Sequence, residues 1–329
     1  MGLKIGINGF GRIGRYLTRL LADDKNIEIA AINARTGNEE LARLLKYDSV
    51  HRTFHGEVST WEEGIVVCGR KIRITRLGAG EWCWADLGID IVVDTTGKFV
   101  ERDKAEGHIS SGAKKVIISA PAKNPDCTIV MGVNENEYDP ARHHVISSAS
   151  CTTNCLAPVA KVLNDAYGIK HGLMTTIHSY TMSQRILDGS HKDPRRARAA
   201  CISLIPTTTG AARATTAVLP ELKGKLDGYA IRVPTADGSI VDLTCELEKS
   251  VTKEEVNALF KSKANAAMGY TEEPLVSVDY LGDTHGGVVD GPLTTVLDNN
   301  MVKVVIWYDN EAGFTNQLVR LVNMVVTKK

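Results

Sequence analysis

The stretch "INGFGRIGR", residues 7–15, joins the end of an apolar strand to the start of a helix, and its glycines are Gly9, Gly11 and Gly14. This is the pattern G-x-G-x-x-G. In a dinucleotide-binding loop the first glycine permits a tight turn and the second lets the backbone approach a pyrophosphate. The third allows the helix to pack closely on the strand, and the helix N-terminus supplies free N–H groups. The stretch therefore predicts a dinucleotide site, although a Gly-rich turn without a ligand remains an alternative for the pattern alone.

The chain around this loop alternates short apolar strands with helical stretches. Such strands, buried on both faces, are typical of a parallel sheet covered by helices. The fold class predicted for the first half is α/β, a Rossmann-type doubly wound parallel sheet. An antiparallel excursion is expected at "IVVCGRKIRIT". The strands are expected at 3–8, 27–33, 89–96, 113–120 and 143–148, and the helices at 12–23 and 38–48.

The pattern changes after residue 150. Alternating strands separated by turn residues indicate an α+β domain with a mixed or antiparallel sheet. A chain of 329 residues is long for one core, so two domains are expected, with a boundary near residue 150. Helices are expected at 152–167 and 313–327, and strands at 173–180, 227–234, 239–248 and 302–309.

The composition excludes several classes of protein. Lys and Arg total 39 and so do Asp and Glu, so no global field favours nucleic acid or an anionic membrane. No apolar run is long enough to span a bilayer, and the start of the chain reads as a strand rather than a leader. The seven cysteines are odd in number and scattered, which favours free thiols in a cytoplasm over a disulfide framework.

Cys151 lies in "SSASCTTNC", residues 147–155, together with Cys155. A structural zinc site needs four ligands and no second pair is evident, so no metal is predicted. A disulfide between the two cysteines fits the spacing but is opposed by a reducing compartment. At a helix N-terminus Cys151 would instead be a nucleophile, because free N–H groups favour the thiolate. The spacing alone does not decide between these.

A nucleophilic cysteine usually needs a base, and His178 ends the apolar strand "LMTTIHSY". A histidine at a strand end is more often structural than catalytic, so both readings stay open. The segment 183–200 is rich in arginine, and "IPTTTGAARA" and "IRVPT" follow it. Guanidinium groups, hydroxyls and backbone N–H groups bind small phosphate esters, although a solvated loop is the alternative.

One expected part of the nucleotide site is missing. An acidic residue at the end of the second strand normally holds the ribose hydroxyls. Here Asn33 is followed by Ala34 and Arg35. Without a carboxylate, a barrier to a 2′-phosphate is absent, so NADP is predicted as a cofactor alongside NAD.

Taken together, "INGFGRIGR", "LLKYDSVH", "ISAPAK", "SASCTTNC", "TTIHSYT", "IPTTTGAA", "LPELKGKLDG", "RVPT" and "WYDNEAGF" resemble phosphorylating glyceraldehyde-3-phosphate dehydrogenase across essentially the whole chain. The resemblance implies a dinucleotide-binding domain at 1–150, onto which a C-terminal helix at 313–329 packs back, and a catalytic domain at 151–312. It implies that Cys151 is the nucleophile and His178 its acid–base partner, with Cys155 unreactive. The expected reaction oxidises glyceraldehyde 3-phosphate with inorganic phosphate and NAD or NADP through a thioester, in glycolysis or gluconeogenesis.

The resemblance also assigns binding residues. Thr181 and Arg232 match the site for the substrate's phosphate. The region for the attacking phosphate matches Ser150, Thr152, Arg196, Thr209 and Gly210. The cofactor contacts match Gly9, Gly11, Arg12, Ile13, Gly14, Asn33, Ala34, Arg35, Arg76, Ser119, Ser190 and Asn310.

The family implies a homotetramer in which the loop 179–200 lines a neighbour's cofactor site. Within this loop Gly189 and Ser190 replace the Leu-Pro pair of many NAD-specific relatives, and Ser190 offers a hydroxyl to a 2′-phosphate. Ser183 and Phe314 also depart from the residues of many relatives. The alternatives are an erythrose-4-phosphate dehydrogenase and a non-catalytic protein that binds a nucleotide or RNA.

Overall fold

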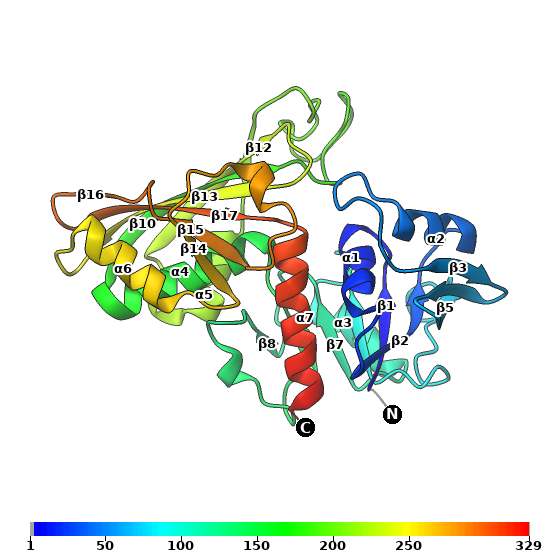
Figure 1. The fold of residues 1–329 in the computed structure, drawn as a ribbon. Coiled ribbons are helices and arrows are strands. Elements are labelled where there is room, and N and C mark those ends of the chain that lie inside the picture. Colours follow the sequence, from blue (N-terminus) through cyan, green and yellow to red (C-terminus); the bar gives the residue numbers. More distant parts are fainter. Residues whose placement is uncertain (1–2, 329) are drawn as a thin grey trace. The chain divides into compact units, whose positions relative to one another are not determined.

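The computed structural model describes residues 3–328 and divides into two compact units. The first comprises Met1–Ile129, Glu135–Ala149 and Leu318–Lys329, and the second comprises Val130–Asn134 and Ser150–Gln317. Each unit contains a sheet of its own, and most of the strands and helices are labelled in Figure 1.

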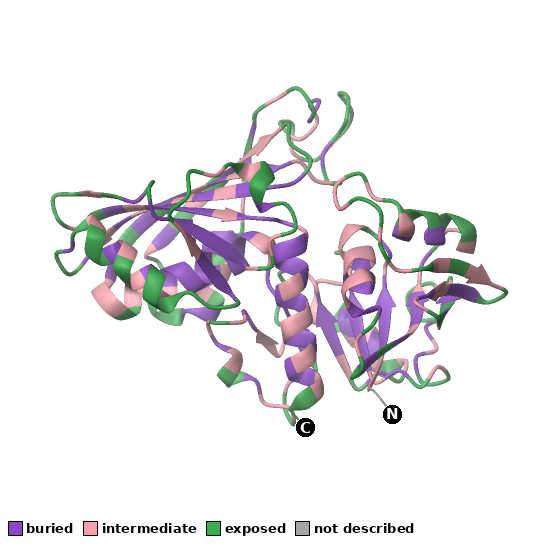
Figure 2. Cartoon of the chain, viewed as in Figure 1, coloured by how far each residue is buried: buried purple, intermediate pink, exposed green. Residues whose placement is uncertain are grey.

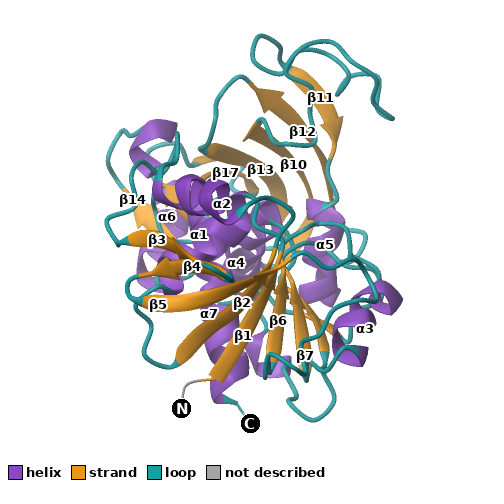
Figure 3. Ribbon diagram, turned by 90° about the vertical axis from the view of Figure 1, so that its right-hand side faces the viewer, coloured by secondary structure: helices purple, strands orange, loops and turns teal. Residues whose placement is uncertain are grey.

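The first unit is built on a sheet of nine strands. These are β1 (Leu3–Asn8), β2 (Ile27–Asn33), β3 (Val58–Trp61), β4 (Gly64–Val67), β5 (Arg70–Thr75), β6 (Ile91–Asp94), β7 (Lys115–Ile118), β8 (Cys127–Thr128) and β9 (Val145–Ser147). They are ordered β3-β4-β5-β2-β1-β6-β7-β9-β8 and fan out with the usual twist (Figure 3). All pairs are parallel except β3–β4 and β4–β5, which confirms the predicted antiparallel excursion.

The strand order reverses beside β1. From β1 the chain passes to β2 on one side and later to β6 on the other, so Asn8 and Asp94 lie opposite each other at the carboxyl ends. Helix α1 (Arg12–Leu21) begins just beyond this point, with Gly11 as its N-cap. In open α/β sheets ligands bind at such a switch point, outside the carboxyl ends of the strands.

The glycines of this loop meet different constraints. Gly9 has a φ of +97°, which side chains rarely adopt. A Cβ on Gly14 would lie 2.4 Å from the carbonyl oxygen of Gly9, so only glycine lets the helix approach the loop this closely. Gly11 has no atom within 4 Å of its would-be Cβ, and open space lies beside it. The turn at Gly9 and the close packing at Gly14 are those that the sequence predicts.

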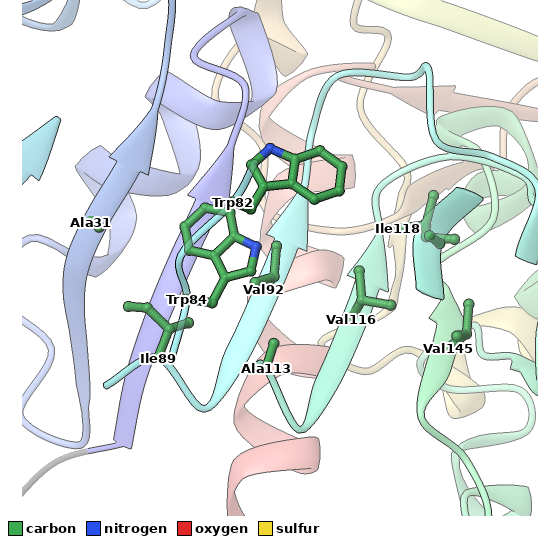
Figure 4. Packing of buried hydrophobic residues seen from close by; sticks show 10 residues of the cluster. Ala31, Trp82, Trp84, Ile89, Val92, Ala113, Val116, Ile118 and Val145 are labelled. Atoms are coloured by element: carbon green, nitrogen blue, oxygen red, sulfur yellow. The ribbon is translucent and has the colours of Figure 1, made fainter. Parts of the chain in front are cut away.

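Trp84 lies in a buried hydrophobic cluster with Val92 and Val116, part of which is shown in Figure 4, and His108 is fully buried as well. Trp84 Nε1 donates to His108 Nδ1 at 3.1 Å, and His108 Nε2 lies 3.2 Å from Asp94 Oδ2. Because burial of an unpaired polar group is unfavourable, each of these side chains needs its neighbour.

The chain of side-chain hydrogen bonds continues from Asp94 across the sheet. Asn8 Nδ2 donates to Asp94 at 2.7 Å, and Asn33 Nδ2 donates to Asn8 Oδ1 at 2.9 Å. Thr75 Oγ1 donates in turn to Asn33 Oδ1 at 2.9 Å. The ends of β6, β1, β2 and β5 are therefore held in register beneath the glycine loop.

The second unit contains a mixed sheet. Its strands are β10 (Ile169–Ser179), β11 (Ile205–Thr208), β12 (Leu226–Val233), β13 (Ser239–Leu247), β14 (Met268–Thr271), β15 (Gly287–Asp290), β16 (Thr295–Leu297) and β17 (Met301–Tyr308). The order is β11-β12-β10-β13-β17-β15-β14, and β16 pairs with β17. Only β10–β12 and β14–β15 are parallel among the named pairs, which confirms the predicted mixed sheet.

Helix α4 (Cys151–Tyr167) packs against this sheet and is buried along most of its length (Figure 2). Its N-cap is Ser150, whose Oγ accepts from the Thr153 N–H at 3.1 Å. Helices α5 (Ala211–Val218) and α6 (Lys253–Lys263) contact α4. Leu173 on β10 and Tyr229 on β12 are 69% and 48% exposed.

The predicted elements are present with shifted ends. Helix α1 ends at Leu21 rather than Asp23, and α2 (Asn38–Lys46) ends at Lys46 rather than Asp48. Helix α3 (Arg102–Ser110), α5 and α6 were not predicted. Helix α7 (Ala312–Thr327) belongs to both units, because Ala312–Gln317 fall in the second unit and the residues from Leu318 in the first.

The glycine loop yields a test of the fold. Gly14→Ala places a Cβ against the Gly9 carbonyl and should lower the free energy of unfolding by about 1–3 kcal/mol, the range for overpacking. Gly11→Ala is the matched control and should cost less than about 1 kcal/mol, since only its capping preference changes. Chemical denaturation of the protein without cofactor measures both. Equal losses for the two variants would contradict the close approach at Gly14.

Candidate active site

Cys151 and His178 meet in the second unit. Cys151 is the first residue of α4 and His178 is the penultimate residue of β10. The Sγ of Cys151 lies 3.4 Å from Nε2 of His178. The start of a capped helix and the end of a buried strand thus bring together a thiol and an imidazole, as the family resemblance implied.

The pKa values of this pair differ from those that the sequence predicts. Burial raises the pKa of the Cys151 thiol, and the nearby Arg232 and Thr152 only partly offset this. Burial, and then the charge of Arg232, lower the pKa of His178 to about 3. The predicted lowering of the Cys151 pKa was therefore wrong for this arrangement, because desolvation outweighs the helix terminus. Both shifts act against a preformed pair of thiolate and imidazolium.

Arg232 lies on the other side of the imidazole ring. Its Nη1 is 2.6 Å from His178 Nδ1 and donates to the Ser179 carbonyl oxygen at 2.9 Å. Its Nε is buried without a hydrogen-bond partner. Thr181, which is predicted to bind the same phosphate, has its Oγ1 3.0 Å from Ser183 Oγ. Ser183 is one of the two positions that depart from many relatives, so this departure contacts a predicted binding residue.

A group of hydroxyls surrounds Thr152, the residue after Cys151. Tyr308 OH is 3.0 Å from Thr152 Oγ1 and 2.8 Å from Thr176 Oγ1. Burial raises the pKa of Tyr308 well above its ordinary value, so the phenol stays protonated. The ring of Tyr308 also meets the ring of His178 edge-on at 5.8 Å. Sequence reasoning missed Tyr308 and Thr176, whose only signal is their place on inward-facing strand positions.

Asn310 is held by the same strand ends. Ser239 Oγ donates to Asn310 Oδ1 at 2.6 Å and accepts from the Ser179 N–H at 3.1 Å. The amide of Asn310 is thereby fixed relative to the residue that follows His178. Ser239 was also missed by sequence reasoning.

Four of the five residues predicted for the attacking phosphate lie at two helix starts, and Arg196 lies in the loop after β10. Ser150 and Thr152 begin α4, while Thr209 and Gly210 precede α5, whose N-cap Gly210 makes no side-chain hydrogen bond. Arg196 Nε donates to Thr207 Oγ1 at 2.8 Å. Helix N-termini and guanidinium groups attract anions, so this arrangement suits inorganic phosphate.

The first unit contains a cavity of about 290 Å³ at the strand ends. Gly9, Asn33, Ala34, Arg35 and Arg76 line it, which brings together most of the predicted adenosine contacts. Sequence reasoning missed other lining residues, which include Trp82, Lys98 and Phe99. Lys98 and Phe99 follow the end of β6, a position that the parallel sheet makes a site candidate.

Other predicted cofactor residues do not line this cavity. Gly11, Ile13 and Gly14 belong to the helix start, and Ser119 follows β7. The guanidinium of Arg12 forms an ion pair with Asp48, and its Nη2 donates to Asp48 Oδ1 at 3.0 Å. Burial alone would raise the pKa of Asp48, but the hydrogen bonds from Arg12 and two backbone N–H groups hold it well below its usual range. Arg12 therefore braces the loop after α2.

Ser190 lies in the exposed loop of the second unit. Its carbonyl oxygen accepts from Arg185 Nε and Nη2 at 3.0 and 2.8 Å. These bonds fold the loop back on itself between Arg185 and Ser190.

The seven cysteines are all free thiols, which agrees with the expectation that no disulfide forms.

Comparison with known proteins assigns the family. Residues 3–102 match the family model described as glyceraldehyde 3-phosphate dehydrogenase, NAD binding domain, and residues 150–310 match the C-terminal domain of the same family. The chain belongs to the glyceraldehyde-3-phosphate dehydrogenase family. The predicted recognition and fold class are confirmed, and the family is one of NAD-dependent oxidoreductases.

Individual relatives cover the whole chain. A glyceraldehyde-3-phosphate dehydrogenase of Geobacillus stearothermophilus is 56% identical over 100% of this chain and 99% of its own. Glyceraldehyde-3-phosphate dehydrogenase 1 of Bacillus cereus is 55% identical over 99% of both chains. The enzyme of Streptomyces coelicolor is 53% identical over 98% of both. These matches do not favour an erythrose-4-phosphate dehydrogenase or a non-catalytic binding protein.

The pair of Cys151 and His178 yields a test by alkylation. Because His178 Nε2 is close enough to accept the thiol proton, iodoacetamide should modify Cys151 faster than the other six cysteines at neutral pH. His178→Asn should slow this modification at least about tenfold, as expected for a lost base. His171→Asn, on the same strand but exposed, is the matched control and should leave the rate unchanged. Peptide mapping gives the rates, and equal effects of both variants would return His178 to a structural role.

Proposed function

We propose that this chain catalyses the phosphorylating oxidation of glyceraldehyde 3-phosphate to 1,3-bisphosphoglycerate with NAD or NADP, in glycolysis or gluconeogenesis. The observation that carries the proposal is the 3.4 Å approach of Cys151 Sγ to His178 Nε2 in a chain of this family. Domain roles follow from it. The unit with the glycine loop would bind the dinucleotide, and the unit with Cys151 would carry out the chemistry.

The residues of the first unit fit a dinucleotide. Gly9 and Gly14 leave no room for side chains, while Gly11 opens onto free space at the start of α1. The first turn of α1 has no side-chain cap, so its N–H groups remain available for a pyrophosphate. When bound, the nicotinamide of NAD or NADP accepts a hydride from the substrate carbon.

The first chemical step forms a bond between Cys151 Sγ and the aldehyde carbon. Because both pKa shifts oppose a preformed ion pair, His178 would accept the thiol proton as the C–S bond forms. The oxygen of the resulting hemithioacetal would be stabilised by the Cys151 backbone N–H and by His178.

His178 would first give the thiol proton to the oxygen of the hemithioacetal and so become neutral again. It would then take the proton of this hydroxyl as hydride leaves. Loss of this proton supplies the electron pair that forms the carbonyl as hydride leaves the carbon. The product is a thioester on Cys151, which keeps the energy of the oxidation. Inorganic phosphate attacks the thioester carbon, the C–S bond breaks, and the acyl phosphate leaves as His178 returns a proton to sulfur.

The two phosphates would be held separately. Arg232 and Thr181 would hold the phosphate of the substrate, because Arg232 lies against His178 and has a buried Nε without a partner. Arg196, Ser150, Thr152, Thr209 and Gly210 would hold the attacking phosphate near the starts of α4 and α5.

The environment and assembly are inferred from the surface. In residues 3–328 no helix is long and apolar enough to cross a bilayer. Seven free thiols support a reducing cytoplasm. Exposed apolar side chains on β10, β12 and the loop after β10, among them Leu173, Ile186 and Tyr229, support a homotetramer that covers them.

The proposal is tested by initial rates. The protein should reduce NAD or NADP with glyceraldehyde 3-phosphate only when inorganic phosphate is present for turnover. Cys151→Ser should lower kcat by at least about 10³-fold while the cofactor still binds, since the covalent step is lost. The Cys155→Ser control, at a buried thiol one helical turn away, should retain kcat. Activity that survives in Cys151→Ser would sink the thioester mechanism.

Cofactor choice rests on the side chains around position 34. Ala34 offers no carboxylate, and three cationic side chains, Arg35, Arg76 and Lys98, line the same cavity. A 2′-phosphate would therefore meet attraction in place of repulsion. Ser190 adds a hydroxyl in the loop that the family places at a neighbour's cofactor site. These observations support use of NADP alongside NAD.

This yields a prediction for Ala34→Asp. The carboxylate should repel a 2′-phosphate and accept from the ribose hydroxyls, which should shift the ratio of kcat/KM toward NAD by about 1–3 kcal/mol. Ala34→Asn is the matched control without charge and should shift the ratio less. The measurement is kcat/KM with each cofactor for the three proteins. An absence of NADP turnover in the unmodified protein would contradict the proposal.

A further inference from the structure

Arg196 is held by a threonine hydroxyl and not by the carboxylate that lies beside it. Its Nε donates to Thr207 Oγ1 at 2.8 Å, whereas the carboxylate oxygen Oδ2 of Asp193 is 3.7 Å from the same nitrogen. A charge-assisted bond between a guanidinium and a carboxylate is about 2.7–2.9 Å long. The two opposite charges are therefore about 1 Å too far apart for a direct hydrogen bond.

Thr207 connects the two charged groups. It lies on β11, the edge strand of the sheet in the second unit (Figure 3), and its side chain is buried. Its Oγ1 donates to Asp193 Oδ2 at 2.8 Å and accepts from Arg196 Nε. These directions are fixed by chemistry, because a guanidinium can only donate, an ionised carboxylate can only accept and a hydroxyl does both.

The carboxylate of Asp193 is a strong partner for any cation within reach. The hydrogen bond from Thr207, and then that from the Arg195 N–H, lower the pKa of the Asp193 carboxyl. Its Oδ1 accepts from this N–H at 2.9 Å, so the hydroxyl of Thr207 is the side-chain donor on Oδ2. The group is therefore an anion at neutral pH, next to an arginine that it does not bind directly.

The bridge leaves the guanidinium of Arg196 available to a ligand. Its Nη2 donates to the carbonyl oxygen of Thr208 at 3.3 Å, and its Nη1 makes no hydrogen bond to any of residues 3–328. Two neutral oxygens orient the group without removing its charge. A direct pair with a carboxylate would instead occupy its donors and neutralise it. An oriented and charged guanidinium binds an anion with a smaller loss of conformational freedom.

We propose that Thr207 is a positioning residue, which keeps Arg196 apart from Asp193 and thereby keeps the guanidinium open to inorganic phosphate. The inference rests on the proposed function, in which Arg196 holds the attacking phosphate. Thr207 acts through Arg196 and needs no contact with the phosphate. Without the hydroxyl, Arg196 Nε loses its acceptor and Asp193 Oδ2 loses its donor. Because each group then needs a partner, the two close into a direct ion pair.

A purely structural role for Thr207 makes a different prediction. If its hydroxyl only ties the loop after β10 to β11, then loss of the hydroxyl and loss of the Asp193 charge both weaken the same link. The two changes together would be at least as harmful as either one. If the hydroxyl separates two charges, removal of the Asp193 charge instead cures the loss of the hydroxyl, because no carboxylate is left to capture Arg196.

Initial rates of the full chain test the single change. Thr207→Val keeps the shape of the side chain and should raise KM for inorganic phosphate about tenfold or more, as for a lost charge-assisted hydrogen bond. KM for glyceraldehyde 3-phosphate should stay the same. Arg196→Met sets the upper limit of the effect. The matched control is Thr244→Val on β13, which removes a hydroxyl 3.4 Å from Asp242 Oδ1 and should leave both KM values unchanged.

The double variant Thr207→Val with Asp193→Asn decides between the two roles. Its KM for phosphate should return to within about threefold of the unmodified protein, since a neutral amide does not capture a guanidinium as a carboxylate does. Thr207→Ala replaces Thr207→Val in both proteins if the valine variant does not fold. A double variant with a KM for phosphate as high as that of the single variant, or a single variant that raises both KM values equally, would overturn the proposal.

Binding of inorganic phosphate without turnover separates this inference from the proposed function. Phosphorus-31 NMR titrations should show weaker binding in Thr207→Val and recovered binding in the double variant. A chain that follows this order but does not oxidise the aldehyde would disprove the proposed function and retain the role of Thr207. A chain that oxidises the aldehyde with the same KM for phosphate in all variants would disprove the role of Thr207 alone.

Discussion

The active site depends on how Ser179 is held at the end of β10. Its N–H donates to Ser239, and its hydroxyl donates to the Gly238 carbonyl at 2.8 Å. Its own carbonyl oxygen accepts from Arg232, beside His178. Ser179 is fully buried, so none of these groups has water as a substitute. Through this residue the positions of His178, Arg232 and Asn310 are fixed together.

The two units meet the same physical requirement in different ways. In each unit, polar groups are buried at the strand ends, directly beneath the residues that would contact a ligand. These buried groups need hydrogen-bond partners within the protein. The first unit uses a line of side chains from His108 through Asp94 and Asn8. The second uses backbone groups and hydroxyls around one serine. Rigid strand ends of both kinds hold functional groups in place before a ligand arrives, which lowers the cost of binding.

Much of the fold was predictable from short-range patterns in the sequence. The spacing of Gly9 and Gly14, the apolar strands and the change of pattern near residue 150 follow from local rules of turns and periodicity. The pairing of Cys151 with His178 needed the resemblance, because these residues are 27 apart in sequence and only the fold brings them together. The pKa values were not predictable, since the burial of the thiol depends on the surrounding packing. Tyr308 and Ser239 gave no signal beyond their places in strands, because the partners of a polar strand residue are known only from the fold.

Helix α7 has a consequence for synthesis of the chain on the ribosome. The first unit takes its sheet from the early part of the sequence, but its helical segment from Leu318 is made only after the second unit. Leu318, Leu321 and Val322 are buried in the complete chain. Until they emerge, the surface of the first unit that they contact lacks its cover and is open to chaperones. This dehydrogenase would therefore complete its first unit last, and a nascent chain stalled before residue 318 would hold a nucleotide unit with an exposed apolar side.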